Sequence, residues 1–319
     1  MTRPVLGIYT PILHLPQIHK ILSQHFEVLY YPDLTYEEAL ENIGKVEYIF
    51  TNPNKLKFKF DAKLLENARK LKLFATASTG HDHVDINLLQ SKKIEFISLR
   101  NQFKVLEKLT STSELAFLFL MSYARNFTQA LQSVKQGDWD YQKFVGNRIQ
   151  DLRIGVIGFG RLGKIFGNYC YQFGANVGVY DPYVAIDPRY LTYKSLTDLF
   201  KDSDVISIHV HLDSKTKNLV NSSLLNLTKS NFALINTSRG SIVNEVDISS
   251  WIDKSKGHFY LTDVVSNELD NISDSKLIKK SIECSQIIVT PHIGGMTLRG
   301  QSIAYETVAN QIIDYSNTF

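Results

Sequence analysis

The sequence predicts an α/β protein with two domains, each built on a doubly wound parallel sheet. Short strand-like segments alternate with helical patterns along the chain, which is typical of parallel strands joined by crossover helices. A second alternating series begins after the turn-rich stretch 137–140. Because 319 residues are more than one domain usually needs, we expect about two domains with separate cores.

The first hundred residues contain four predicted strands. Residues 5–9, 26–30, 48–50 and 72–76 are short apolar runs of the kind that strands form. Between the last two lies a helical pattern over 61–68, whose apolar residues share one face. These elements predict a first parallel sheet.

A long helix is predicted after this series. Ser111 and Glu114 have the spacing of a capping box, in which two side chains satisfy free backbone amides at a helix N-terminus. Residues 115–121 are apolar on every face, and such a helix is buried on all sides. We expect this helix to lie between domains or subunits, with a plain core helix as the alternative.

The second series contains six predicted strands and ends in a helix. The strands are residues 153–157, 176–180, 205–209, 232–235, 260–262 and 287–289. Six strands with crossovers match a doubly wound nucleotide-binding sheet. The final helix, over 299–315, could return to the first domain.

Composition argues against several classes of partner. A net charge of +3 is too small to favour nucleic acid or a membrane surface, and the most apolar stretch, 115–121, is far shorter than the roughly 18 residues of a membrane span. The N-terminal residues show no long apolar signal core. Cys170 and Cys284 lack metal-binding spacing, which predicts reduced thiols and no structural metal. We therefore expect a cytoplasmic protein.

The most specific motif is G-x-G-x-x-G at Gly158, Gly160 and Gly163. It follows an apolar strand and opens a helix, which favours a dinucleotide fingerprint over a glycine-rich turn in a core. Gly158 would allow the tight turn, Gly160 the approach of a pyrophosphate, and Gly163 close packing of helix on strand. The pyrophosphate would bind the free amides at the helix start.

An acidic residue at the end of the next strand favours NAD over NADP. Asp181 lies 21 residues after Gly160, the spacing of a carboxylate that binds the adenosine ribose hydroxyls. A carboxylate at that point would repel a 2′-phosphate. The alternative is that Asp181 only begins a turn with Pro182.

Three predicted strands end in groups that could carry out chemistry. Arg239 follows the fourth strand of the second series, Asp263 and Glu268 follow the fifth, and His292 follows the sixth. Open α/β sheets bind their ligands at these strand ends. Taken singly, such a histidine is more often structural and such a glutamate more often solvated. Together, beside a nicotinamide, these groups suit the reduction of a ketone next to a carboxylate. The arginine would bind the carboxylate, and the histidine would donate the proton.

These features together resemble the D-isomer-specific 2-hydroxyacid dehydrogenase family, which includes phosphoglycerate, D-lactate and glycerate dehydrogenases. The similarity covers nearly the whole chain. Its motifs are Thr79–Asp85, Ser113–Leu115, Gly158–Gly163, Asn236–Gly240, Asp263 with Glu268, and Pro291–Gly295.

The resemblance implies a role for each matching residue. Arg239 would bind the substrate carboxylate and carbonyl, His292 would be the acid/base, and Glu268 would support the protonated ring. The substrate carboxylate would meet the backbone near three residues of the first domain, Ser78, Thr79 and Gly80. The implied cofactor-binding residues are Gly158, Gly160, Arg161, Leu162, Gly163, Asp181, His209, Thr237 and Asp263.

The resemblance also implies two Rossmann-like domains with an active-site cleft between them. Residues 1–101 with 296–319 would form a flavodoxin-like substrate domain, and 102–295 would form the NAD-binding domain. The cleft would close on a small 2-keto or 2-hydroxy acid. Homodimers would form through the NAD-binding domains.

The expected function is that of an NAD-dependent D-2-hydroxyacid dehydrogenase, or 2-keto acid reductase, whose acid the sequence does not name. The stretch 51–54 lacks the arginine typical of phosphoglycerate dehydrogenases, and the neighbouring Lys55, Lys57 and Lys59 are more simply explained as a solvated loop. A non-catalytic NAD(H)-sensing module of the corepressor type is the alternative, because such modules share the fold and the Arg, Glu and His set.

Overall fold

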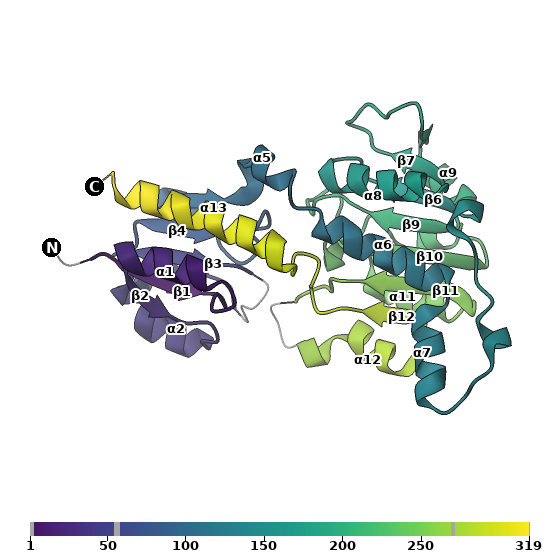
Figure 1. Ribbon diagram of the computed structural model, residues 1–319, viewed down its shortest axis with the longest axis horizontal. Helices are drawn as coiled ribbons and strands as arrows, with labels where there is room; N and C mark the ends of the chain where they lie inside the picture. The colour runs from purple at the N-terminus through teal and green to yellow at the C-terminus, as the bar shows by residue number, and fades with distance from the viewer. Residues whose placement is uncertain (1–2, 54–57, 269–271, 319) are drawn as a thin grey trace. The chain divides into compact units, whose positions relative to one another are not determined.

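The computed structural model describes residues 3–53, 58–268 and 272–318, and the chain divides into two compact units (Figure 1). Unit 1 comprises Met1–Leu109 and Met296–Phe319, and unit 2 comprises Thr110–Gly295. The first boundary lies after Leu109, where the sequence predicted it after residue 101. The difference arises because Leu106, in a short helix, is buried in the core of unit 1.

Unit 1 contains a parallel sheet of five strands in the order β2-β1-β3-β4-β5, which is the order of flavodoxin-like sheets. The strands are β1 (Val5–Tyr9), β2 (Glu27–Tyr30), β3 (Tyr48–Thr51), β4 (Leu73–Thr76) and β5 (Glu95–Ser98). The first four confirm the prediction. The fifth was not predicted, because only two of its four residues, Phe96 and Ile97, are apolar.

Helices cover both faces of this sheet. They are α1 (Pro16–His25), α2 (Tyr36–Asn42), α3 (Ala62–Asn67), α4 (Ile86–Ser91), α5 (Phe103–Leu106) and α13 (Leu298–Ser316). Successive strand residues face opposite sides, so Phe50 packs with α1 and α13 while Ile49 packs with α2 and α3. The predicted final helix is thus confirmed as part of unit 1.

Unit 2 contains a parallel sheet of seven strands in the order β12-β11-β10-β9-β6-β7-β8. The strands are β6 (Arg153–Ile157), β7 (Asn176–Tyr180), β8 (Leu191–Thr192), β9 (Val205–Ile208), β10 (Asn231–Asn236), β11 (Gly257–Thr262) and β12 (Ile287–Val289). All six predicted strands are present. The order reverses beside β6, so the carboxyl ends of β6 and β9 mark the switch point where such sheets bind ligands.

Seven α-helices of the described residues belong to unit 2. They are α6 (Ser111–Ala124), α7 (Phe127–Lys135), α8 (Arg161–Gln172), α9 (Leu196–Asp202), α10 (Ser222–Leu225), α11 (Glu245–Ile252) and α12 (Lys276–Glu283). In the described parts of the chain, none of the helices combines the length and the hydropathy that crossing a bilayer requires.

The structure corrects two details of α6. Its N-cap is Thr110 and not Ser111, and the Thr110 hydroxyl donates a hydrogen bond to Glu114 Oε1 at 2.5 Å. The helix is not buried on every side, because Leu118 is 54% exposed. Its buried residues, including Leu115 and Phe119, pack against the sheet of unit 2.

Candidate functional site

The glycine turn after β6 has the geometry that its motif predicted. Gly158 has φ +88°, a conformation that side chains disfavour, and an added Cβ would lie 2.6 Å from the His209 carbonyl oxygen. A Cβ on Gly163 would lie 2.0 Å from the Gly158 carbonyl oxygen, so helix and strand are in direct backbone contact. A Cβ on Gly160 would meet nothing within 4 Å. Gly160 therefore borders open space at the start of α8.

The N-terminus of α8 is suited to an anion. The helix begins at Arg161, with Gly160 as its N-cap and no side-chain hydrogen bond to cap it. The first-turn amides of a helix have no partner inside the helix and carry a partial positive charge. The Ser113 hydroxyl donates to the Leu162 carbonyl at 2.9 Å, which ties α6 to this first turn.

Asp181 follows β7 and holds the glycine turn. Its Oδ2 accepts a hydrogen bond from the Phe159 amide at 2.7 Å, and its Oδ1 accepts from the amides of Tyr183 and Val184 at 2.8 and 3.2 Å. Each carboxylate oxygen has two lone pairs, so Oδ2 retains one for a further donor such as a ribose hydroxyl. Asp181 can therefore serve both the loop and a nucleotide.

His209 and Thr237 follow β9 and β10, the next strands along the sheet. The His209 ring packs against Phe166, and its Nε2 lies 2.9 Å from the Ser207 hydroxyl. Burial lowers the pKa of His209 to about 3, so the ring is neutral at physiological pH. Among the described residues, His209 Nδ1 and Thr237 Oγ1 are buried atoms without a hydrogen-bond partner. Buried polar atoms are normally paired, so a bound group with polar atoms fits this edge of the sheet.

Arg239 lies in a tightly bonded turn after β10. The Asn236 side chain accepts from the Ser238 amide at 3.0 Å and donates to the Arg239 carbonyl at 2.9 Å. The Ser238 hydroxyl donates to the Ile208 carbonyl at 2.8 Å, which fastens the turn to β9. These bonds fix the backbone from which the guanidinium extends.

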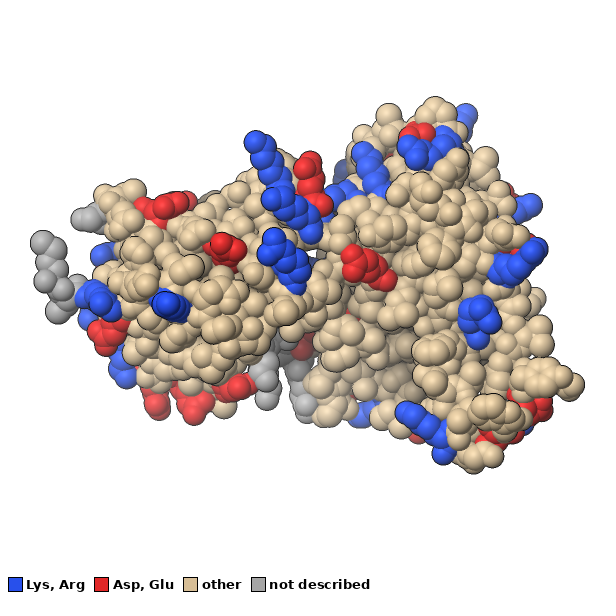
Figure 2. Space-filling view, in the orientation of Figure 1, with Lys and Arg blue, Asp and Glu red and all other residues tan. Residues whose placement is uncertain are grey.

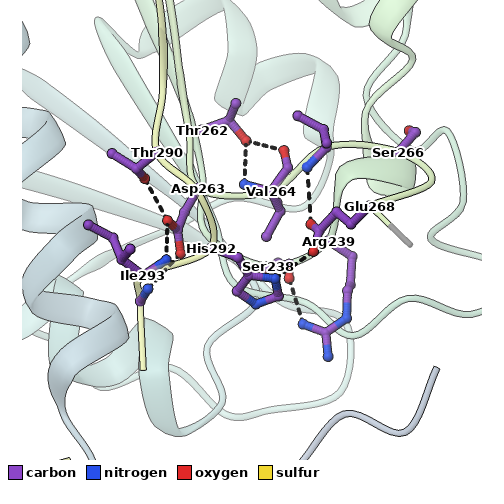
Figure 3. Close-up of polar contacts among 12 residues, drawn as sticks. Ser238, Arg239, Thr262, Asp263, Val264, Ser266, Glu268, Thr290, His292 and Ile293 are labelled. Atoms are coloured by element: carbon purple, nitrogen blue, oxygen red, sulfur yellow. Dashed lines mark hydrogen bonds and ion pairs between the residues drawn. The ribbon is translucent and has the colours of Figure 1, made fainter. Parts of the chain in front are cut away.

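Glu268 and His292 form a direct pair. His292 Nδ1 lies 2.5 Å from Glu268 Oε2, and both side chains are 27% exposed (Figure 3). The other carboxylate oxygen accepts from the Val265 amide at 3.1 Å. In Figure 3 the His292 ring and the Arg239 guanidinium extend to the same side of the loops that carry them. The arginine, glutamate and histidine predicted from three strand ends are thus gathered at one edge of the sheet.

His292 has φ +54°, an unusual backbone conformation for a residue other than glycine. Its amide donates to the carbonyls of Asp263 at 3.0 Å and Thr290 at 2.9 Å. Strained backbone of this kind persists where surrounding bonds enforce it, and it gathers at functional sites.

Asp263 fastens the segment that carries His292. Its Oδ1 accepts from the Thr290 hydroxyl at 2.5 Å and the Ile293 amide at 2.8 Å, and its Oδ2 accepts from the Gly294 amide at 2.7 Å. Burial raises the pKa of Asp263, against these hydrogen bonds and the nearby His292, which lower it. The sequence predicted Asp263 as a cofactor residue and did not anticipate this bracing, which depends on contacts between two strand ends.

Sequence reasoning placed Gly240 in a family motif but gave it no role, and in the structure it joins the loops of Arg239 and Glu268. A Cβ there would lie 2.0 Å from the Val265 carbonyl carbon and 2.2 Å from the Ser266 nitrogen. The two backbones therefore touch at this point. The glycine directly after Arg239 was the available signal.

Ser78, Thr79 and Gly80 follow β4 and belong to unit 1. The Ser78 hydroxyl donates to the Gly80 carbonyl at 2.6 Å and lies 3.0 Å from the Thr76 hydroxyl. The loop is at the carboxyl edge of its own sheet. Its binding of a substrate carboxylate stays a prediction.

Among the described residues, no three His, Cys, Asp or Glu side chains gather as metal ligands would. Residues 117–294, more than half of the chain, match the family model for the NAD-binding domain of D-isomer-specific 2-hydroxyacid dehydrogenases. The chain belongs to this family. The predicted resemblance is thereby confirmed, and unit 2 contains the family's NAD-binding domain.

Relatives of this family member have several names. D-3-phosphoglycerate dehydrogenase of Methanocaldococcus jannaschii is 30% identical over 309 residues, which cover 96% of this chain and 56% of that protein. Hydroxypyruvate reductase of Thermotoga maritima is 28% identical over 243 residues, which cover 76% of this chain and 77% of that protein. The chain spans about half the length of most of the phosphoglycerate dehydrogenases that it matches.

Among solved structures, D-lactate dehydrogenase from Aquifex aeolicus, complexed with NAD and lactic acid, has a TM-score of 0.84 with this dehydrogenase-family chain. The two are 25% identical, and the match covers 98% of this chain and 96% of the other. The predicted α/β fold with two parallel sheets is confirmed by this likeness.

Proposed function

We propose that this family member is an NAD-dependent D-2-hydroxyacid dehydrogenase that acts as a 2-keto acid reductase. The observation that carries the proposal is the Glu268–His292 pair beside the Arg239 loop, on the sheet edge that also holds the glycine turn. The three groups differ in chemistry and come from three strand ends. Reduction of a 2-keto acid would use all three of them.

NADH, when bound, supplies the hydride for reduction of the substrate carbonyl. Amides at the start of α8 would bind its pyrophosphate, where Gly160 leaves room for close approach. The Asp181 carboxylate would accept the ribose hydroxyls. The unpartnered polar atoms of His209 and Thr237, together with Asp263, would line the rest of the nucleotide.

His292 supplies the proton. Its Nδ1 faces Glu268, and Nε2 would donate the proton to the substrate oxygen. The hydrogen bond to the Glu268 carboxylate fixes the orientation of the ring. In the oxidation direction the neutral ring would take the proton back.

Arg239 would bind the substrate. A planar guanidinium can grip a carboxylate with two parallel hydrogen bonds, and a further N–H can polarise the adjacent carbonyl. The backbone of Ser78, Thr79 and Gly80 would hold the same carboxylate. A small 2-keto acid or 2-hydroxy acid is the class of substrate that would make these contacts.

A substrate screen tests the proposal. NADH oxidation would be followed with pyruvate, glyoxylate, hydroxypyruvate, 2-oxoglutarate, 3-phosphohydroxypyruvate and bulkier keto acids. We expect turnover of at least one. The phosphorylated acid belongs in the screen because the relatives include phosphoglycerate dehydrogenases, while Asn54, Lys55 and Lys57 lie outside the described residues.

An Arg239→Lys variant tests the proposed role of Arg239 in the same assay. Loss of the forked guanidinium should lower kcat/KM by about 100-fold or more while the Kd for NADH is unchanged. Arg148→Lys is a matched control, because Arg148 pairs with Asp151 on the surface. NADH binding without turnover of any acid would reject the enzyme and favour an NAD(H)-sensing module. Unchanged kinetics in Arg239→Lys would reject the assigned role.

We also propose that the protein forms a homodimer through unit 2 in the cytoplasm, where its free thiols, Cys170 and Cys284, would stay reduced. Figure 2 shows few charged side chains over α6 and α7. Trp139, Tyr141 and Val145 are each more than 80% exposed, which a second copy of the chain would relieve. Sedimentation should give a dimer for the wild type and a monomer for Trp139→Ser/Tyr141→Ser. A wild-type monomer would reject this part.

A further inference from the structure

The loop that carries Glu268 is held by two carboxylates. Glu268 itself accepts a hydrogen bond from the Val265 amide, and Glu245 Oε1 accepts one from the neighbouring Ser266 amide at 2.6 Å. Asn267, between Ser266 and Glu268, has φ +59°, the left-handed conformation that asparagine tolerates in tight turns. The second carboxylate supplies support from a different element.

Glu245 is well placed for this task. It is the first residue of α11, six residues after Arg239, and the 3-10 turn Gly240–Ile242 lies between the two. Asn244 caps the helix by accepting from the Val246 and Asp247 amides, so the Glu245 side chain is left to reach across to Ser266. One short segment therefore bears Arg239 and also grips the loop of Glu268.

The electrostatic surroundings of Glu245 support a role in the site. Burial raises its pKa, the amide and hydroxyl of Ser266 lower it, and the charge of Glu268 raises it. Glu245, Glu268 and His292 thus form a chain of interacting groups that runs from α11 to the end of β12. A carboxylate kept partly buried beside another carboxylate costs stability, and such arrangements gather at functional sites.

We propose that Glu245 is a positioning residue that holds the Ser266 peptide and thereby keeps Glu268 against His292. The kinetic consequence of this inference rests on the proposed reductase function. The competing explanation is that Glu245 only favours the N-terminus of α11 through the helix dipole, which would affect stability alone.

Three variants separate these explanations. Glu245→Ala removes the acceptor of the Ser266 amide, whereas Glu245→Gln keeps an oxygen that can accept it. Asp247→Asn is the matched control, because Asp247 lies in the same helical turn and accepts from the Ser222 amide at the start of α10. The measurements are kcat/KM for keto acid reduction against pH, the Kd for NADH, and the NMR titration of the His292 ring.

We expect Glu245→Ala to lower kcat/KM by about tenfold, with the Kd for NADH changed less than about twofold. The high-pH fall of its activity should move to lower pH, because Glu268 no longer supports the protonated ring. Glu245→Gln should restore most of the rate, and Asp247→Asn should match the wild type. Equal losses in Glu245→Ala and Asp247→Asn, or an unchanged pH profile in Glu245→Ala, would overturn the proposal.

The NMR titration keeps this test independent of turnover. If no keto acid is reduced, the proposed function fails, yet the His292 ring can still be observed and assigned with a His292→Gln spectrum. The ring should titrate at lower pH in Glu245→Ala than in the wild type, with Glu245→Gln closer to the wild type. Identical titration in all three proteins would overturn the positioning role by itself.

Discussion

Gly240→Ala would push apart the loops that carry Arg239 and Glu268. The new Cβ would lie 2.0 Å from the Val265 carbonyl carbon, 2.2 Å from the Ser266 nitrogen and 2.4 Å from the Val265 oxygen. Ordinary contact begins at 3.4 Å, and all three atoms belong to backbone that cannot turn aside. The loops must therefore separate by about 1.4 Å, the difference between the shortest contact and an ordinary one.

A displacement of about 1 Å in an active site can cost about 100-fold in rate. We therefore expect Gly240→Ala to lower kcat/KM by about 100-fold, or about 2.7 kcal/mol of transition-state stabilisation. Overpacking should also reduce the free energy of unfolding by about 1–3 kcal/mol. The Kd for NADH should change less than kcat/KM, because the glycine turn follows a different strand and, of the proposed nucleotide-binding residues, only Thr237 and Asp263 adjoin the displaced loops.

Steady-state kinetics, NADH titration calorimetry and urea unfolding measure these three quantities. Gly160→Ala provides the contrast: its Cβ meets nothing within 4 Å, so stability should persist, while the methyl group obstructs the pyrophosphate and weakens NADH binding. Wild-type kcat/KM in Gly240→Ala would refute the reasoning. Loss of NADH affinity equal to the loss of rate would also refute it, because the damage would then reach beyond the two loops.

Three further variants probe the titrating groups. Glu268→Gln should move the pH optimum of reduction lower, since the protonated His292 ring loses its carboxylate; a rate profile across pH checks this, and an upward shift would contradict it. Burial lowers the pKa of His209 to about 3, so the free energy of unfolding should fall as pH drops below about 6.5, by up to about 1.4 kcal/mol per pH unit. His209→Gln should lose less of this free energy than the wild type when urea unfolding at pH 7 is compared with unfolding at pH 4. Equal losses in the two proteins would contradict this prediction. Burial raises the pKa of Glu245, so its cost to the native state is absent at low pH and grows as pH rises through that pKa. Glu245→Gln should therefore raise the Tm at pH 8 but not at pH 4, and a lower Tm at pH 8 would count against this sign.

Much of the fold was predictable because its strands are unusually clear in the sequence. The strand 153–157 is a buried apolar run that ends at Gly158, and periodicity together with turn residues suffices for such segments. The strands β5 and β8 were missed because they are short, carry little buried surface and are supported by neighbours in the sheet. The N-cap of α6 was misplaced by one residue because the four successive hydroxyl residues Thr110 to Ser113 can each begin a helix.

The residues of the candidate site that follow strands could be predicted from the sequence by a single rule. Because ligands bind at the carboxyl ends of parallel strands, Arg239 and His292 could be assigned to one edge from their positions after strands. The supports of the site could not be found in this way. Glu245 and Ser266 are 21 residues apart and meet only through packing of α11 beside the β11 loop, and no periodic pattern records that contact.

The last helix determines the order in which this protein can fold during synthesis. Unit 2 is inserted between two stretches of unit 1, and α13 contributes Tyr305, Val308 and Ile312 to one face of the unit 1 sheet. A ribosome releases the strands of unit 1 and α1 first, yet the part of that face that α13 covers stays open until residues after 298 have emerged. Unit 2 can therefore complete its core earlier, and the nascent chain must shield an unfinished apolar surface in the meantime.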